Sequence, residues 1–455
     1  MLHIPHHIFR EYDIRGIAYQ DIDEAFAYRL GQSFTRLLPE GETRPMSVAH
    51  DARLSSPAFH QALIEGVNSM GVDVLNLGMM PSPLAYFSVF HCQTSACIVT
   101  TASHNPSPYN GFKFMLGKDS LHGESIQKLY QIMQQEQIAS TIIGKNTPFD
   151  IQALYETFVR ETCLISRPLK VVIDAGNGPS GIVAAPLFRK MGCEVTELYC
   201  QPDGRFPNHH PDPSVEENLQ DLKIKVLEEH ADLGIAFDGD GDRIGIIDEQ
   251  GNMIWNDLLL LILAKDLLKK HPQSTIISEI KSSYLLYDGI HQAGGKAIMW
   301  RTGHSPIKEK MKETGAKLAG EMSGHIFYAD QYDGFDDAIY AGVRLMQIVA
   351  DSMRPLSFQL HDIPKTASTP EIRIPCSDDK KFKLVELAKV YFRQQGYDII
   401  DIDGMRIQTN DSWGLLRASN TQAALTLRFE APNIEKLQHI QALIETWIQD
   451  QGDIS

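Results

Sequence analysis

Three aspartates at alternate positions are the residues of this chain that most clearly point to chemistry. Asp238, Asp240 and Asp242 lie in the segment Asp-Gly-Asp-Gly-Asp-Arg, which ends at Arg243. Carboxylates at this spacing can converge on one hard cation, and Mg²⁺ suits such a site because it keeps positions for phosphate oxygens or water. The alternative is a solvated acidic turn. That alternative is disfavoured because apolar runs precede and follow the segment and predict two strands joined by a tight connection.

A serine beside a histidine is the second such feature. Ser103 and His104 follow the apolar run 96–100, and Lys113 lies ten residues further on. Serine attack on phosphorus needs a proton acceptor, and the transferring group needs cations around its oxygens. The alternative is an ordinary turn or cap serine, and no Gly-x-Ser-x-Gly elbow surrounds Ser103 to suggest a hydrolase. Together with the aspartates, this segment predicts phosphoryl transfer through a phosphoserine.

Three weaker motifs contain groups that suit a phosphorylated sugar. Arg10 and Arg15 flank Tyr12 near the N-terminus, where arginine could bind phosphate or simply pair with a neighbouring carboxylate. The segment 320–325, Gly-Glu-Met-Ser-Gly-His, would direct Glu321, Ser323 and His325 to one side if it were extended. Its alternative is a polar turn with an exposed histidine.

The third of these weaker motifs is Arg417-Ala-Ser-Asn-Thr421, between two strand candidates. Arginine, hydroxyl and amide side chains with free backbone N–H groups make a phosphate cradle. An ordinary hairpin turn is the alternative. Lys281, Arg301 and His304 belong to the same repeat unit as the segment 320–325, and we expect them to face the same cleft.

The elements that must position these residues follow a repeated pattern. Three segments, beginning near 46, 171 and 275, each read as a strand, a polar or small-residue loop, a helix, a glycine and another strand. This βαβ pattern predicts an α/β protein with three related domains and mixed sheets. The last 90 or so residues place short strands between two helices, which predicts an α+β domain. We expect boundaries at 1–150, 151–252, 253–366 and 367–455, with the four domains around a central cleft.

Composition limits the class of protein. A chain of 455 residues is too long for one core. The formal net charge of −16 argues against a nucleic-acid-binding surface. No apolar run is long enough for a membrane span, and the first residues do not resemble a signal peptide. The six cysteines form no Cys-x-x-Cys pair, so we expect a reduced, cytoplasmic protein that is a monomer or weak dimer.

The five motifs, in this order and over nearly the whole chain, resemble the α-D-phosphohexomutase superfamily. The segment 320–325 is similar to that of the phosphomannomutase/phosphoglucomutase branch, whereas phosphoglucosamine mutases usually have glutamine in place of Met322. One departure is Gln422-Ala-Ala424, where the family more often has Thr-Pro.

The resemblance implies a role for each motif. Ser103 would carry the phosphoryl group and, with Asp238, Asp240 and Asp242, would bind Mg²⁺. The groups implied around the phosphoserine are Arg15, His104, Lys113 and Arg243, and His325 would serve near the substrate as a catalytic group. The residues implied in substrate binding are Tyr12, Lys281, Arg301, His304, Glu321, Ser323, Arg417, Ser419, Asn420 and Thr421.

The activity that the resemblance implies is a reversible conversion of mannose or glucose 1-phosphate into the 6-phosphate. It would proceed through a hexose 1,6-bisphosphate, which also serves as activator, and the intermediate would turn end for end between two transfers. The phosphate cradle must then accept either end, so we expect it on a mobile domain whose closure excludes water. Phosphoglucosamine mutase and metal-dependent sugar phosphatase are the alternatives, and a non-catalytic sugar-phosphate sensor is a third.

Overall fold

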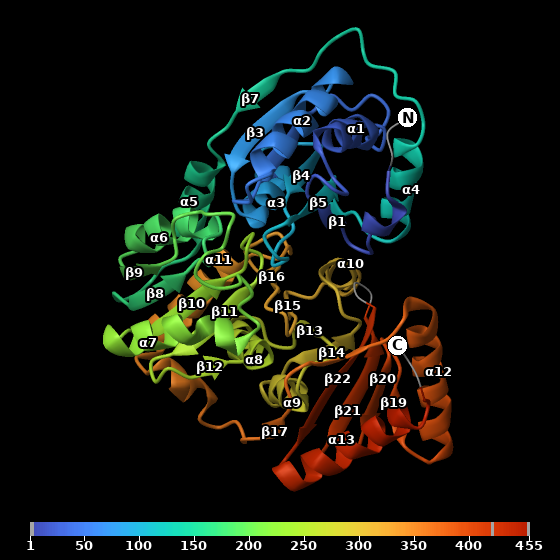
Figure 1. Cartoon of the computed structure of the whole chain (residues 1–455). Coiled ribbons are helices and arrows are strands. Elements are labelled where there is room, and N and C mark those ends of the chain that lie inside the picture. Colours follow the sequence, from blue (N-terminus) through green and yellow to red (C-terminus); the bar gives the residue numbers. More distant parts are fainter. Residues whose placement is uncertain (1–3, 420–422, 453–455) are drawn as a thin grey trace.

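A computed structural model of the chain describes residues 4–419 and 423–452, and it contains four sheets, each in its own unit of structure (Figure 1). The first unit has the strands β1 (Ile14–Ile17), β2 (Met46–His50), β3 (Val74–Met79), β4 (Ala96–Thr100), β5 (Tyr109–Leu116), β6 (Asp119–Ser120) and β7 (Asn146–Pro148). Its helices are α1 (Glu24–Thr35), α2 (Ser56–Ser69), α3 (Ser82–His91) and α4 (Glu124–Met133), with the short 3-10 helix η1 (His6–Ile8) before them.

The second and third units follow along the chain. The second has β8 (Lys170–Asp174), β9 (Glu194–Leu198), β10 (Leu233–Phe237), β11 (Ile244–Asp248) and β12 (Met253–Ile254), with α5 (Ile151–Thr162), α6 (Ser180–Lys190), η2 (Glu216–Leu219) and α7 (Gln220–Glu228). The third has β13 (Thr275–Glu279), β14 (Lys296–Trp300), β15 (Leu318–Gly320) and β16 (Ile326–Tyr328), with α8 (Asn256–Lys270), α9 (Tyr284–Gln292), α10 (His304–Thr314), α11 (Ala338–Ser352) and η3 (Leu356–Leu360).

The first three units share one arrangement of four strands. The central orders are β3-β2-β4-β5, β9-β8-β10-β11 and β14-β13-β15-β16. In each, the first three strands are parallel and the fourth is antiparallel to the third. The prediction of three related α/β units with mixed sheets is therefore confirmed. In each sheet, the connection between the third and fourth strands reverses the chain at the carboxyl end of the third strand.

The fourth unit has a different topology. Its strands are β17 (Ala367–Ser368), β18 (Ile372–Pro375), β19 (Asp398–Ile400), β20 (Met405–Gln408), β21 (Trp413–Ala418) and β22 (Ala424–Ala431), and its helices are α12 (Asp378–Gln394) and α13 (Ile434–Gln449). All of its strand pairs are antiparallel. Both helices pack on this sheet, and Figure 1 shows the unit apart from the other three in the lower right of the molecule. This confirms the predicted α+β domain.

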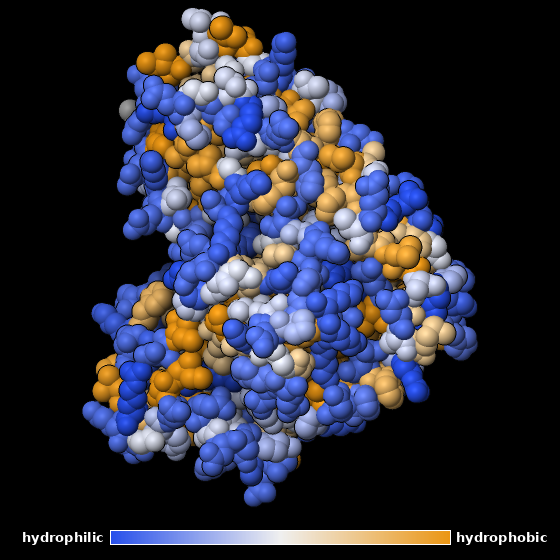
Figure 2. Space-filling view, turned by 180° about the vertical axis from the view of Figure 1, so that it is seen from behind, coloured by the Kyte–Doolittle hydropathy of each residue, from blue (hydrophilic) through white to orange (hydrophobic). Residues whose placement is uncertain are grey.

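The apolar cores show which units pack together. One large apolar cluster includes Val99 of the first unit, Ile235 of the second and Leu260 of the third, all completely buried. The fourth unit has its own cluster around Phe392 and Leu427. Figure 2 shows the molecule hollowed on the side where the first and fourth units face each other, with mostly hydrophilic residues along the rim. Among the described residues, no helix is long and apolar enough to cross a membrane.

Candidate active site

Three of the sequence motifs occupy equivalent positions in the three related sheets. The Ser103 loop joins β4 to β5, the aspartate loop joins β10 to β11, and the segment 321–325 joins β15 to β16. Each is the reversal between the third and fourth strands of its sheet. A contact joins the first loop to the second, and another joins the second to the third, as the following geometry shows. The repeat therefore brings residues far apart in the sequence to one place.

The aspartate loop is a tight turn organised by its own first carboxylate. Asp238 Oδ1 accepts hydrogen bonds from the backbone N–H groups of Gly241, Asp242 and Arg243, at 2.9, 3.1 and 3.1 Å. Gly241 adopts a φ of +80°, which glycine tolerates without strain. These bonds leave the second oxygen of Asp238 free to point toward the first unit.

Ser103 meets the aspartate loop across the boundary between the first two units. Its hydroxyl donates to Asp238 Oδ2 at 2.7 Å and lies 3.1 Å from His104 Nδ1. Burial, followed by the charge of Arg243, lowers the pKa of His104 well below its ordinary value. The imidazole is therefore neutral at neutral pH, with a proton on one of its two ring nitrogens. Ser103 itself is 1% exposed.

Lys113 extends from β5 into the same cluster. Its Nζ lies 2.7 Å from Asp240 Oδ2 and 2.5 Å from Asp242 Oδ2. Burial opposes the charged form of Lys113, but the attraction of Asp240 and Asp242 outweighs it and raises the pKa. At Asp238 the charged form is disfavoured instead. Burial and then its two negative neighbours raise the pKa of that carboxyl well above its usual range. The cluster is therefore short of positive charge near Asp238.

The three carboxylates have the properties of a divalent-cation site. One oxygen from each of Asp238, Asp240 and Asp242 lies within 4.8 Å of the others, and all three residues are completely buried. Asp240 Oδ1 and Asp242 Oδ1 are buried without a hydrogen-bond partner among the described residues. Buried charged oxygens are costly without a partner. A bound hard cation would satisfy them and relieve the crowding of negative charge.

The segment 321–325 differs from the extended conformation predicted for it. The backbone N–H of Glu321 donates to the carbonyl of His325, that of Gly324 donates back to Glu321, and Gly324 adopts a φ of +101°. The segment is thus a tight turn, and strand-like alternation cannot be the reason its polar side chains lie near one another. The prediction was wrong because an antiparallel reversal this short forces the backbone to turn.

His325 lies deep in the site and contacts the aspartate loop. Arg243 Nε donates to His325 Nε2 at 3.1 Å, and His325 Nδ1 lies 3.1 Å from the carbonyl of Asp242 and 3.0 Å from Asp336 Oδ2. An Nε2 that accepts this bond leaves the ring proton on Nδ1, where it faces two oxygens. His325 is 4% exposed, so the alternative of an exposed turn histidine does not hold.

Glu321 and His304 lie beside this group on the third unit. Glu321 Oε1 accepts from the backbone N–H of Gly303 at 2.7 Å. Burial, then the neighbouring Glu279, raises the pKa of Glu321. The ring of His304 lies 5.5 Å from that of His325, and burial lowers the pKa of His304 well below its usual value.

Residues of the first, third and fourth units meet near Thr302. The Tyr12 hydroxyl donates to the carbonyl of Thr302 at 3.1 Å, and the backbone N–H of Thr302 donates to Asp403 Oδ2 at 2.9 Å. The same Asp403 oxygen accepts from Arg417 Nε at 2.7 Å. The cradle arginine of the fourth unit is therefore linked through one aspartate to a loop of the third and to Tyr12 of the first.

The remaining predicted residues lie at the edges of this arrangement. Lys281 Nζ lies 3.2 Å from Glu371 Oε2, and Arg15 donates both to Asp13 and to Asn105 of the Ser103 loop. Arg301 is exposed and lies 4.0 Å from Glu309, and Ser323 is half-buried in the turn. Ser419 is buried at the end of β21. Asn420, Thr421 and Gln422 lie outside the described residues.

Sequence reasoning missed several side chains that support the site. Ser82 donates to Asp240 Oδ2 at 2.5 Å, and Asp336 contacts His325. Asp403 holds Arg417, and Asp51 with Arg53 lies behind the Ser103 loop. None of these residues stands in a motif that carries its own chemical signal, so only their spatial neighbours reveal them.

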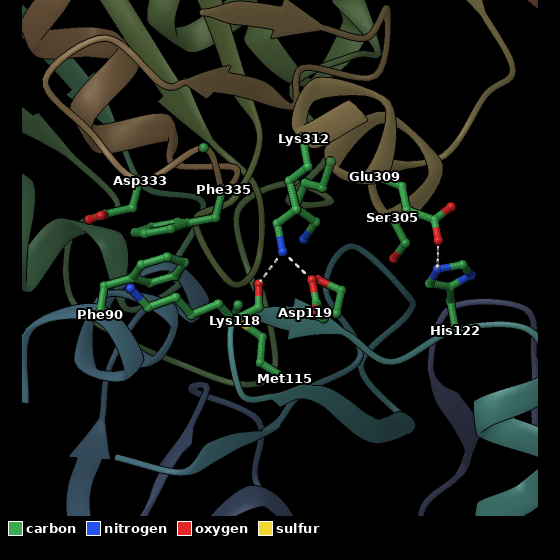
Figure 3. Close-up of a pocket in the computed structure, with 13 residues that line it drawn as sticks. Phe90, Met115, Lys118, Asp119, His122, Ser305, Glu309, Lys312, Asp333 and Phe335 are labelled. Atoms are coloured by element: carbon green, nitrogen blue, oxygen red, sulfur yellow. Dashed lines mark hydrogen bonds and ion pairs between the residues drawn. The ribbon is translucent and has the colours of Figure 1, made fainter. Parts of the chain in front are cut away.

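A small pocket on the boundary between the first and third units shows how these units are joined (Figure 3). Lys312 of α10 donates to the carbonyl of Lys118 at 2.9 Å and also contacts Asp119, and His122 lies 3.8 Å from Glu309. The polar contacts cross the boundary at several points. They add direction to the apolar core that the first three units share.

Comparison with known proteins gives the same division of the chain. Four family models match, described as phosphoglucomutase/phosphomannomutase alpha/beta/alpha domains I, II and III at residues 6–139, 151–251 and 255–367, and as its C-terminal domain at 371–446. A phosphomannomutase/phosphoglucomutase of Pseudomonas aeruginosa is 41% identical, over 98% of this chain and 96% of that protein. A phosphoglucomutase of Neisseria meningitidis is 42% identical, over 100% of this chain and 99% of that protein. The crystal structure of a phosphoglucomutase/phosphomannomutase family protein from Burkholderia thailandensis covers 100% of this chain and 99% of its own, with 38% identity and a TM-score of 0.92.

Proposed function

Because this chain belongs to the phosphoglucomutase/phosphomannomutase family and is a hexose phosphate mutase, we propose that Ser103 is the residue that carries its phosphoryl group. One observation supports this assignment above the others. The Ser103 hydroxyl lies 2.7 Å from Asp238 within a buried cluster that also contains Asp240, Asp242 and Lys113. A nucleophile, carboxylates for a cation and a fixed positive charge are the parts that phosphoryl transfer requires.

The proposed substrates are mannose and glucose phosphates, interconverted between the 1-phosphate and the 6-phosphate. Relatives at 41 to 42% identity are named phosphomannomutase/phosphoglucomutase or phosphoglucomutase, whereas a probable phosphoglucosamine mutase is 35% identical. This favours the hexose over the amino sugar. A sugar phosphatase, the other alternative, would release phosphate to water; the burial of Ser103 and its neighbours disfavours that outcome.

The proposed reaction consists of two transfers in opposite directions. The bond between phosphorus and Ser103 Oγ breaks as a bond forms between phosphorus and the free hydroxyl oxygen of the hexose monophosphate. The hydroxyl proton passes to a base of the enzyme. The resulting bisphosphate turns end for end, and Ser103 Oγ then takes the phosphoryl group from the other oxygen, which regains a proton. Atoms and charge balance over the cycle, and the phosphoenzyme is regenerated.

We assign Lys113 the role of a cation in these transfers. Its raised pKa keeps it protonated, and its Nζ lies beside Asp240 and Asp242, where it would stabilise the negative charge that develops on the transferring oxygens. His104 and His325 remain the candidates for moving the proton. His104 Nδ1 lies 3.1 Å from Ser103 Oγ, and because the Ser103 hydroxyl donates to Asp238, the Nδ1–H of His104 is the donor in this contact.

Asp238, Asp240 and Asp242 would hold Mg²⁺, with Ser103 or its phosphate as a further ligand; the cation would neutralise charge on the phosphoryl oxygens. One buried oxygen each of Asp240 and Asp242 has no hydrogen-bond partner among the described residues, which supports this choice of ligands. A trace of hexose 1,6-bisphosphate would serve as activator by phosphorylating any enzyme that has lost its phosphate.

The other predicted residues are assigned to the sugar and to the phosphate that is not reacting. Glu321 and Ser323 would bind sugar hydroxyls. Arg417 would bind the distal phosphate. The residues proposed to assist them are Tyr12, Arg15, Arg243, Lys281, Arg301, His304, His325, Ser419, Asn420 and Thr421.

The Ser103→Ala variant tests the proposed function. Purified protein with Mg²⁺, a trace of bisphosphate and each hexose 1-phosphate should form 6-phosphate. The variant should lose at least about 10³-fold in turnover, because the group that accepts phosphorus is gone. Ser95→Ala is the matched control, since Ser95 is a buried serine just before β4, at the opposite end from Ser103. Equal turnover of both variants would remove Ser103 from its role, and free phosphate without 6-phosphate would select the phosphatase.

A further inference from the structure

A buried arginine outside the reacting groups binds the backbone of the Ser103 loop at several points. Arg53 has no exposed surface. Its guanidinium donates to the carbonyls of Ser103 at 2.7 Å, Asn105 at 2.6 Å, Pro106 at 2.8 Å and Tyr109 at 2.9 Å. Only arginine among the side chains offers five donors in one rigid plane, so one residue can hold a whole loop in this way.

Asp51 completes this arrangement from the other side. Asp51 Oδ2 accepts from Arg53 Nε at 3.1 Å and from the Thr101 hydroxyl at 2.7 Å. The Thr101 hydroxyl oxygen in turn accepts the backbone N–H of Ser103 at 2.9 Å. Both main-chain polar groups of Ser103 are therefore tied to the pair of Asp51 and Arg53, one directly and one through Thr101.

The backbone of Ser103 needs such support because its conformation is unfavourable. Its φ is +49°, in the left-handed region that side-chain-bearing residues seldom occupy. This conformation costs about 1–2 kcal/mol for an ordinary residue and persists only where the surroundings impose it. It is also the conformation in which the hydroxyl lies 2.7 Å from Asp238.

The same arginine lies against the second unit, which carries Asp238. The Arg53 guanidinium lies over the ring of Phe206, with 5.2 Å between Cζ and the ring centroid. Ser107 Oγ donates to the carbonyl of Gly204 at 2.7 Å. A Cβ on Gly204 would come within 2.4 Å of the carbonyl of Ala52, so the two backbones meet closely only because this residue is glycine. These contacts thus fix the Ser103 loop relative to the second unit, whose Asp238 accepts the hydrogen bond from the Ser103 hydroxyl.

We propose that Arg53, supported by Asp51, is a positioning residue for phosphoryl transfer. It holds the Ser103 loop in the strained backbone conformation that places the hydroxyl beside Asp238. The proposal rests on the assignment of Ser103 as the phosphoryl carrier. Arg53 does not itself touch the reacting atoms through any side-chain contact; it acts through the loop.

Arg53→Lys is the variant that separates positioning from charge. Lysine keeps a positive charge beside Asp51, but its single nitrogen cannot reach four carbonyls at once. We expect kcat to fall by about 10²-fold, since small displacements of a reacting group cost that much. KM for the hexose 1-phosphate should stay within about threefold, because Glu321 and Ser323, proposed to bind the sugar, and Arg417, proposed to bind the distal phosphate, lie in the third and fourth units.

Two further measurements separate a positioning role from a loss of stability. The first is the rate at which dephosphorylated enzyme takes label from hexose 1,6-bisphosphate onto Ser103, which should fall with kcat. The second is the matched control Arg344→Lys, at a buried arginine near Asp330 that is remote in sequence from the Ser103 loop. The control should lose thermal stability with kcat unchanged. If Arg53→Lys also keeps its kcat, or loses activity only in proportion to unfolded protein, the proposal is wrong.

Thr101→Val gives a milder test should Arg53→Lys not fold. Valine has almost the same shape as threonine but removes the bond to the Ser103 N–H, and we expect kcat to fall by about tenfold with KM unchanged. Unchanged kcat and unchanged phosphorylation rate in this variant would overturn the proposal. Failure of the proposal is distinguishable from failure of the proposed function: in the former Ser103→Ala is still inactive, and in the latter it is active.

Discussion

The two ends of the proposed site are held by different kinds of interface. At the phosphoserine end, the first three units share one apolar cluster, represented by Val99, Ile235 and Leu260. At the cradle end, the apolar cluster that joins the third and fourth units is small, with Ile280 on one side and Trp413 and Leu415 on the other. The stabilising free energy from apolar burial grows with the apolar area that is removed from water. The first three units therefore form one body, and the fourth is joined to it far less by apolar contact.

Polar contacts also attach the fourth unit to the third. Arg406 donates to the carbonyls of Ile280 and Ser282, and the Ser283 hydroxyl donates to Glu430. Hydrogen bonds fix orientation strongly but contribute only about 0.5–1.5 kcal/mol each after exchange with water. Such an interface can specify one docked position and still open. This is the difference that a mutase needs, since one end must hold its geometry while the other must release and accept phosphate again.

Of the variants that compare the two ends, Asp240→Asn should have the largest effect, because it acts at the phosphoserine end, which is the rigid end. The change removes one negative ligand from the proposed cation site and the charge that faces Lys113. We expect kcat to fall by about 10²–10³-fold with a weaker response to Mg²⁺. Steady-state kinetics over a Mg²⁺ titration measures both quantities. Asp248→Asn, at a buried aspartate that ends β11 in the same hairpin, is the control and should retain its kcat.

An Asp240→Asn enzyme with normal kcat and a normal Mg²⁺ response would remove the contrast between the two ends. The aspartate cluster would then be a buried structural turn, which differs from the solvated turn that was the alternative interpretation of the sequence. A fall in kcat that extra Mg²⁺ does not relieve would still support the rigid end, because the charge beside Lys113 is lost in either case.

The sequence predicted the elements well because strand and helix periods were regular. The segments expected to begin near 46, 171 and 275 start with β2, β8 and β13 within one residue, and the short strands expected between two helices are β19 to β22, between α12 and α13. The equivalence of the three loops could not be predicted. It depends on which strands pair in parallel, and the pairings of β2 with β4, β8 with β10 and β13 with β15 join strands that are far apart in the sequence, which no local pattern specifies.

The site was predictable where residue type alone implies chemistry. Ser103, Lys113 and the aspartates were named from their types and spacing, and the structure brings them together. Asp336 and Arg53 were not, because a lone aspartate or arginine in the sequence is usually at the surface. Their roles come from burial and from partners that are distant in the sequence.

Arg417→Ala should have a smaller effect, because it acts at the cradle end, on the fourth unit. Its guanidinium is held by Asp403 at 2.7 Å and is proposed to bind the phosphate that is not reacting. Removing such a charge-assisted contact should raise KM by about 10–100-fold and lower kcat less. Arg393→Ala removes an exposed arginine of the same unit that pairs with Asp401, and its kinetics should match the unchanged enzyme. A fall in kcat with unchanged KM would place Arg417 at the rigid end instead.

Acid should weaken the two regions over different ranges of pH. Burial, and then the charge of nearby His50, lowers the pKa of His60 from 6.5 to about 4. As the pH falls below 6.5, the unfolded chain binds this proton and the folded chain does not, so the free energy of unfolding of the first unit decreases. At the contact between the third and fourth units, the positive charge of Lys281 lowers the pKa of Glu371 to about 2. The contribution of Glu371 to the free energy of unfolding is fully present above pH 4.5 and is lost only as the pH falls toward 2.

Hydrogen exchange at pH 6.5 and 4.5 measures this difference. After correction for the intrinsic exchange rate, amides of α2, which carries His60, should lose about 2 kcal/mol of protection. The amides of β22 should change much less over the same interval, because Glu371 keeps its charge. His60→Gln removes the titrating group and should abolish most of the loss in α2. If the loss persists in that variant, or is as large in β22, the acid response belongs to the whole molecule and the two regions are less independent than their cores indicate.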